Sequence, residues 1–250
     1  MTQQKDRIPF LDELRGLSIL LMVLYHGVYD LVVFFGADIS AFSSPALQFF
    51  VPFFAGVFIA VSGVCCRFSR SNLRRGAICL GLGLGLTLFT ALFLPSQSIW
   101  FGILHLLGCC MLLAGASRRL WEGASPLWAL LFGALFLFAF SVPSRRAVGL
   151  PGLWQLPLPG VLFSSPALFP LGFLGEGFAS ADYFPLIPWA FLFFAGVLCS
   201  RPLAKREGPS FLYRSHLPFL AAVGRHTIWV YLLHQPAIFL LLGLLSLLKG

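Results

Sequence analysis

The chain has 250 residues, of which 58% are hydrophobic and only 10% charged, and its mean hydropathy is +0.89. Because a typical soluble domain is roughly 25% charged, this composition excludes a soluble fold, a secreted disulfide scaffold, a disordered tail and a free nucleic-acid-binding protein. The sequence therefore predicts an all-α, polytopic transmembrane helix bundle that forms a single domain over residues 1–250.

Seven apolar segments approach the roughly 20 residues that a transmembrane helix needs. In chain order they are about residues 14–35, 46–66, 77–94, 99–116, 124–142, 184–200 and 226–248, of which the sixth qualifies only just. The segment Pro95-Ser96-Gln97-Ser98 predicts a tight turn between the third and fourth spans.

The net charge of +8 is explained by membrane orientation. With a cytoplasmic N-terminus, fourteen of the seventeen lysine and arginine residues, beginning with Lys5 and Arg7, fall in inward segments, and only Arg145, Arg146 and Lys249 fall outside. This distribution follows the positive-inside rule. It predicts a C-terminus that faces outward, and no nucleic acid as a partner.

The stretch 143–185 is apolar but contains seven prolines, so no helix can run through it. Irregular backbone at membrane depth is tolerated where it is buried in protein or faces a watery cavity. We expect an outward cap or a re-entrant segment; an interfacial loop without function is the alternative. The six cysteines form no CxxC pair and are expected to pack in the interior rather than to form disulfides.

Ionisable residues within spans usually face the bundle interior or a cavity. His26 lies near the middle of the first span, His105 near the middle of the fourth and His234 near the middle of the seventh. Asp30 follows His26 at i+4, and Arg15 precedes His26 by eleven residues, so all three are predicted to share one helix face. The rise from Arg15 to His26 is about 16 Å, which suits an extended acyl-CoA with its phosphate at the cytoplasmic mouth.

This arrangement indicates acyl transfer. A neutral His26 can take a proton from an amine or hydroxyl nucleophile, and Asp30 can fix its tautomer. The alternative is a histidine–carboxylate pair that only holds helices together. For His105 the alternative is close helix packing beside Gly102 and Gly108, and for His234 it is a kink at the following proline. No metal-binding, hydrolase, nucleotide-loop or dinucleotide motif is present, so no metal is predicted.

Two further groups of residues are candidates for ligand contacts. The loop 67–75 holds Arg67, Arg70, Arg74 and Arg75, which suit phosphate; the alternative is the positive-inside rule together with lipid headgroups, and the loop considered alone favours that alternative. At the outer mouth of the sixth span, an acid and two aromatics suit a sugar acceptor or form an interfacial belt. These three residues are Asp182, Tyr183 and Trp189.

The stretch from Leu11 to His26, LDELRGLSILLMVLYH, resembles the opening of the heparan-α-glucosaminide N-acetyltransferase-like family of bacterial membrane proteins. Further matching segments are 61–63, 101–105, 182–189, 224–227 and 234–236. The resemblance implies a multi-pass enzyme of the bacterial cytoplasmic membrane that gives acetyl from cytosolic acetyl-CoA to a glucosamine amine. It would make Arg15 and the loop arginines contacts for the CoA phosphates.

The leading hypothesis is thus a membrane-bound N- or O-acetyltransferase for a sugar or envelope glycan, with His26, Asp30 and His105 as catalytic residues and His234 on the CoA side. Its partners would be acetyl-CoA, the acceptor and membrane lipids, and small residues on several helices would permit a homodimer. The rivals are a proton-coupled transporter or flippase of a small polar or lipid-linked substrate, and a noncatalytic scaffold.

Overall fold

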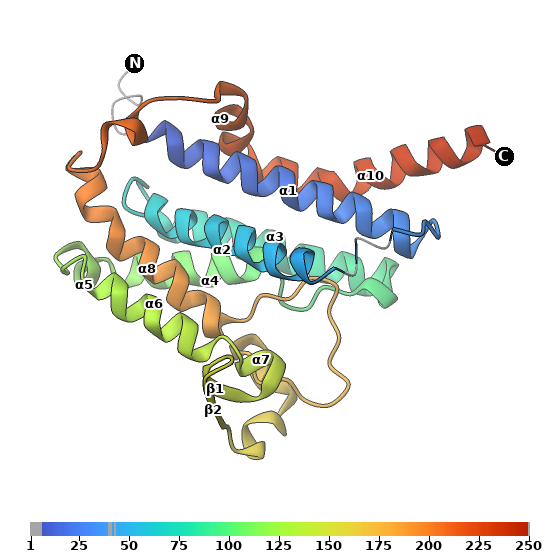
Figure 1. Ribbon diagram of the computed structural model, residues 1–250, viewed down its shortest axis with the longest axis horizontal. Helices are drawn as coiled ribbons and strands as arrows, with labels where there is room; N and C mark the ends of the chain where they lie inside the picture. The colour runs from blue at the N-terminus through green and yellow to red at the C-terminus, as the bar shows by residue number, and fades with distance from the viewer. Residues whose placement is uncertain (1–6, 40–41, 43, 250) are drawn as a thin grey trace. The chain divides into compact units, whose positions relative to one another are not determined.

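The computed structural model describes residues 7–39, 42 and 44–249; Lys5 lies outside them. The chain divides into two compact units, which are described separately (Figure 1). Unit 1 comprises Met1–Val61 and Gly208–Gly250, and unit 2 comprises Ser62–Glu207. The boundary between the units falls within the second long helix, and a single domain over residues 1–250 stays a prediction.

The described residues are mostly helical, as predicted. The helices are α1 (Pro9–Val33), α2 (Pro45–Cys65), α3 (Asn72–Phe93), α4 (Ile103–Ala116), α5 (Arg118–Glu122), α6 (Trp128–Ala139), α7 (Val142–Arg145), α8 (Leu186–Ala204), α9 (Pro218–Arg225) and α10 (Thr227–Lys249). Short 3-10 turns are η2 (Pro95–Gln97), η3 (Gly160–Phe163), η4 (Pro166–Leu171) and η5 (Ser210–Tyr213). The predicted turn between the third and fourth spans is therefore present as η2.

Among the described residues, five segments are long and apolar enough to cross a membrane: Pro9–Val33, Asn72–Phe93, Trp128–Arg145, Leu186–Ala204 and Thr227–Leu248. Two further apolar helices, Phe49–Cys65 and Ile103–Ala116, are shorter. Each of the seven expected spans thus corresponds to a helix, while seven crossings stay a prediction. Much of the outer surface is hydrophobic, as lipid contact requires; on α10, for example, Leu240, Leu244 and Leu248 are exposed.

Unit 1 is organised around α1, which contacts both α9 and α10 (Figure 1). Glycines allow the backbones of α1 and α9 to touch: a Cβ on Gly16 would lie 2.0 Å from the carbonyl oxygen of Leu220, and one on Gly224 would lie 1.8 Å from that of Asp12. No side chain fits at either position. This contact fixes α9, and α10 follows it after a single residue.

Glu13 ties the start of α9 to α1. Its side chain is almost fully buried, and Oε1 accepts hydrogen bonds from the Ser215 hydroxyl at 2.8 Å, the His216 backbone N–H at 2.6 Å and the Leu217 N–H at 2.9 Å. The donors belong to the turn that leads into α9, so a carboxylate on α1 satisfies the backbone at the N-terminus of another helix.

Replacing Glu13 with alanine is expected to destabilise unit 1, because three partly buried hydrogen bonds lose their acceptor, and a fully buried donor left without a partner costs about 1–3 kcal/mol. Glu13→Gln keeps the side-chain oxygen and is the shape-matched control. Thermal unfolding of the purified protein in detergent should show a much lower midpoint for Glu13→Ala than for Glu13→Gln. Equal midpoints would show that the cap contributes little.

Unit 2 contains two closely packed helix pairs, α3 with α4 and α6 with α8. In the first pair a Cβ on Gly76 would lie 2.8 Å from the backbone nitrogen of Leu112, and one on Gly108 would lie 2.6 Å from that of Leu80. Small residues thus let the helix axes approach, as is common between membrane helices. The expected packing role of Gly108 is confirmed.

The proline-rich stretch 143–185 contains more regular structure than the sequence indicated. Strands β1 (Ala147–Leu150) and β2 (Trp154–Pro157) pair antiparallel, with Ala147 opposite Pro157, and η3 and η4 follow. As predicted, no long helix occurs there. Prolines stop helices but tolerate the ends of a two-stranded edge, which explains the hairpin. An outward cap or re-entrant position stays a prediction.

Candidate functional site

In unit 1, polar side chains of α1 meet polar side chains of α10 at three levels. Arg15 contacts Thr227, His26 packs against His234, and Asp30 contacts Gln235. The predicted common face of Arg15, His26 and Asp30 is therefore confirmed, and it is directed at α10. Because the contacts follow the same order along both helices, α1 and α10 run parallel, as the predicted topology requires (Figure 1).

At the first level, Arg15 is held in place but keeps donor capacity. Its Nη2 donates to Thr227 Oγ1 at 2.8 Å, its Nη1 lies 3.8 Å from Asp12 Oδ1, and the guanidinium carbon is 6.0 Å from the Phe58 ring centroid. The Nε atom is buried without a hydrogen-bond partner, and so is the hydroxyl of Ser18 one turn along α1. Buried donors without partners are unusual and suit a bound anion.

At the second level, two imidazole rings face each other from different helices. The ring centroids of His26 and His234 are 5.1 Å apart at an interplanar angle of 54°, and Tyr25 packs edge-on against His26. Nδ1 of His234 contacts the carbonyl oxygen of Tyr231. A carbonyl only accepts, so this contact requires the proton on Nδ1, and in the neutral ring Nε2 then carries the lone pair.

At the third level, the Asp30 carboxylate is fully buried, and both of its oxygens accept from Gln235 Nε2 at 3.1 Å. The expectation that Asp30 orients the ring of His26 therefore differs from the structure, in which Asp30 holds the residue next to His234. Residues at i and i+4 share a face, but an amide from another helix reaches the carboxylate instead. Asp30 thus acts on the pair through the position of α10.

His105 lies in unit 2, and the prediction that it lies near the middle of a span is wrong. The helix begins at Ile103, because the preceding residues pair with another segment: the N–H of Ala181 donates to the Ser98 carbonyl, and that of Phe184 to the Phe101 carbonyl. His105 is consequently the third residue of α4, where it caps the helix.

Both ring nitrogens of His105 are used within unit 2. Nδ1 accepts from the Gly102 N–H at 3.2 Å, which places the proton of the neutral ring on Nε2, and Nε2 then donates to Thr87 Oγ1, also at 3.2 Å. The Thr87 hydroxyl donates in turn to the Ile99 carbonyl at 2.6 Å. This fully connected network is suited to joining α3 to the start of α4, and it leaves the catalytic role of His105 as a prediction without geometric support.

The three residues expected to contact a sugar are occupied by contacts within unit 2. Asp182 Oδ2 accepts from the Ile103 N–H at 3.1 Å at the start of α4, and the Tyr183 hydroxyl donates to the Phe169 carbonyl at 2.6 Å. Burial raises the pKa of Tyr183, so its hydroxyl stays protonated. Trp189 is only 8% exposed and packs against Phe136.

The four arginines of the loop between α2 and α3 differ in exposure and in their contacts. Arg70, Arg74 and Arg75 are exposed, whereas Arg67 is partly buried and held by contacts to α5 and α8. Burial lowers the pKa of Arg67; the nearby Glu122 opposes this effect. Of these four side chains, Arg67 is therefore the one that is held by contacts to other elements of unit 2.

Within the part of the chain that the structure describes, no group of three or more His, Cys, Asp or Glu side chains is arranged to hold a metal ion. Three residues that prove to be partners, Glu13, Thr227 and Gln235, were not predicted from the sequence. For Gln235 a signal was present, since an amide in the middle of an apolar span needs a polar partner. Nothing in the sequence identifies that partner as Asp30.

Comparison with known families gives one match, which covers most of the chain. The model of the family described as heparan-alpha-glucosaminide N-acetyltransferase, catalytic, matches residues 7–236. This range includes all three levels of contact between α1 and α10 in unit 1 and the whole of unit 2. No curated protein and no solved structure matches the chain.

Proposed function

The chain belongs to the heparan-alpha-glucosaminide N-acetyltransferase catalytic family and is thus a membrane acetyltransferase by family; from this premise we propose that it moves acetyl from cytosolic acetyl-CoA to a sugar. The acceptor is an amino or hydroxyl group of a sugar or envelope glycan, and the enzyme lies in the bacterial cytoplasmic membrane among lipids, where small residues on several helices would permit a homodimer. The observation that carries the proposal is the polar stripe of α1, in which Arg15 lies about 16 Å along the axis from the His26–His234 pair.

The proposed reaction is a direct transfer. The acceptor nitrogen or oxygen attacks the thioester carbonyl carbon, the bond from that carbon to sulfur breaks, and CoA leaves as a thiolate. His26 takes the proton that the acceptor loses and passes it to the thiolate. His234, whose neutral tautomer is set by the Tyr231 carbonyl, packs against the ring of His26.

Of the remaining candidate residues, the proposal uses the arginines and does not require Asp182 or Tyr183. CoA phosphates require cations, and the candidates are Arg15 in unit 1 and, separately in unit 2, the loop arginines Arg67, Arg70, Arg74 and Arg75. A sugar site at Asp182 and Tyr183 would require their present contacts to open. For that reason the proposal does not depend on them.

The proposal is tested with purified protein in detergent or nanodiscs. We expect acetyl-CoA to raise the thermal midpoint, and we expect label from acetyl-CoA to appear on at least one member of a panel of amino sugars and polyols. Protein heated to unfolding before the assay is the control for uncatalysed acetylation. Failure of wild-type protein both to bind acetyl-CoA and to transfer the label would contradict the proposal.

A proton-coupled transporter or flippase is the second candidate, because buried Asp30 and the His26–His234 pair would also suit proton movement. Reconstituted liposomes distinguish the two. Uptake or flipping of a substrate without any CoA compound would favour transport, whereas transfer of label without such movement would favour the enzyme.

A further inference from the structure

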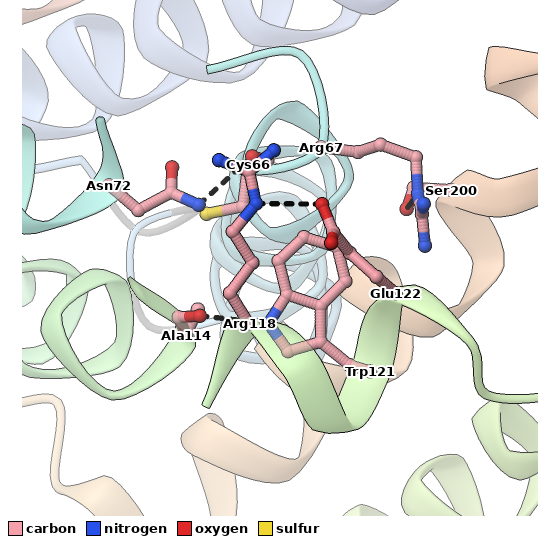
Figure 2. Close-up of polar contacts among 8 residues, drawn as sticks. All are labelled: Cys66, Arg67, Asn72, Ala114, Arg118, Trp121, Glu122 and Ser200. Atoms are coloured by element: carbon pink, nitrogen blue, oxygen red, sulfur yellow. Dashed lines mark hydrogen bonds and ion pairs between the residues drawn. The ribbon is translucent and has the colours of Figure 1, made fainter. Parts of the chain in front are cut away.

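Arg67 lies at the start of the loop between α2 and α3, and its side chain contacts residues of α5 and α8. Its Nε donates to Ser200 Oγ on α8 at 2.7 Å, and its guanidinium carbon lies 5.0 Å from the centroid of the Trp121 ring on α5 (Figure 2). The indole is itself fixed, because Trp121 is buried and its Nε1 donates to the Ala114 carbonyl at 2.8 Å. The guanidinium is thus pre-organised between two helices.

The surroundings of Arg67 carry an excess of positive charge. Arg118 and Arg201 are close enough to interact with the charge of Arg67, and among the described residues Glu122 is the one carboxylate that does so. Glu122 is shared, since its Oε1 accepts from Arg118 Nε at 2.6 Å (Figure 2). Three guanidinium groups against one carboxylate leave two uncompensated positive charges.

The same site contains polar atoms that lack partners. Arg67 Nη2, Ser69 Oγ and Asn72 Oδ1 are buried and make no hydrogen bond within the described residues. Asn72 is oriented by its Nδ2, which donates to the Cys66 carbonyl at 2.9 Å (Figure 2). Buried donors that remain unpaired are costly, so Arg67 Nη2 and Ser69 Oγ on a single loop indicate that an acceptor completes them.

We infer that the Arg67 site, formed by Arg67, Ser69, Arg118 and Arg201, binds a phosphate monoester. A monoester is close to a dianion at neutral pH, whereas a phosphodiester carries one negative charge, so the monoester matches the two uncompensated cations. Guanidinium groups bind phosphate oxygens in pairs. Two ligands carry such a phosphate monoester. One is CoA, through its 3′-phosphate, and this assignment rests on the proposed function; the other is phosphatidic acid of the membrane.

The experiment compares CoA with 3′-dephospho-CoA, which lacks only the monoester. In phosphatidylcholine nanodiscs we expect wild-type protein to bind CoA about 10-fold to 100-fold more tightly than dephospho-CoA, the size of a few charge-assisted hydrogen bonds. Arg67→Gln should weaken CoA binding to the level of dephospho-CoA and leave dephospho-CoA binding unchanged, so the ratio falls to about 1.

Variants on α5 separate this site from general charge effects. Arg118→Gln, at a side chain that is 48% exposed, tests the site without disturbing the core and keeps the test valid if Arg67→Gln does not fold. Arg119→Gln removes the same charge from the neighbouring exposed residue and should preserve the wild-type ratio. Glu122→Gln should tighten CoA binding selectively, and a selective loss would contradict the charge argument.

Nanodiscs with phosphatidic acid identify the lipid source. If the lipid occupies the site, phosphatidic acid should raise the thermal midpoint of wild-type protein but not of Arg67→Gln, and CoA and dephospho-CoA should bind alike. The inference is overturned if neither the CoA ratio nor the phosphatidic acid shift responds to Arg67→Gln and Arg118→Gln. An Arg67-dependent lipid shift in a protein without acetyl transfer would remove the proposed function and retain the site.

Discussion

Replacing His26 with alanine is expected to lower acetyl transfer by about 10²–10⁴-fold, the usual contribution of a general base. The ring of His26 packs against Tyr25 and His234, and it makes no hydrogen bond to another described residue, so its removal leaves no unpaired protein group. The variant should therefore fold and bind CoA. The measurement is initial rate with labelled acetyl-CoA, together with a thermal midpoint with and without CoA.

His226→Ala is the matched control, because that histidine is exposed and lies at the end of α9. Its turnover should stay within a few-fold of wild type. If His26→Ala also turns over at the wild-type rate, His26 is not the base. Unchanged turnover in both variants would make His234, the other ring of the pair, the next candidate for the base.

The second large effect is expected on stability, at the contact between α1 and α9. Gly16→Ala would place a methyl group 2.0 Å from the carbonyl oxygen and 2.8 Å from the carbonyl carbon of Leu220, and backbone atoms cannot move away as a flexible side chain can. We expect a loss of at least about 1–3 kcal/mol, the usual cost of overpacking, with α9 displaced from α1.

Gly27→Ala is the control on the same helix, because a Cβ there meets nothing within 4 Å. It should be neutral or slightly stabilising, since alanine is favoured over glycine in a helix by roughly 0.5–1 kcal/mol. Thermal unfolding in detergent distinguishes the two variants. Similar midpoints would show that α1 and α9 are not in backbone contact.

The apolar segments were predictable because hydropathy is a local property of the chain. The ends of the helices were less predictable. For example, α4 begins at Ile103 rather than near residue 99, because residues 98–101 pair with a segment some eighty positions away. That pairing changes His105 from an expected mid-span residue into a helix cap. It also accounts for Asp182, whose carboxylate bonds to the first residue of α4.

Helical periodicity correctly placed Arg15, His26 and Asp30 on one face of α1, because 3.6 residues per turn fixes angular position without reference to the rest of the chain. Periodicity also suggested that the Asp30 carboxylate would fix the tautomer of the His26 ring. The structure instead pairs Asp30 with Gln235, since hydrogen bonds are decided by which polar group is brought nearest in three dimensions.

By itself, the sequence determined that this is a membrane protein with a polar stripe on its first helix and with basic residues concentrated in alternate loops. Composition and periodicity suffice for this because they are local properties, which depend only on residues close together in the chain. The tertiary structure alone decided which groups far apart in the chain meet: Arg15 with Thr227, His26 with His234, and Arg67 with Trp121 and Ser200 within the second unit. Such pairings depend on close approach of separate helices, which glycines such as Gly16 and Gly224 permit by allowing backbone contact.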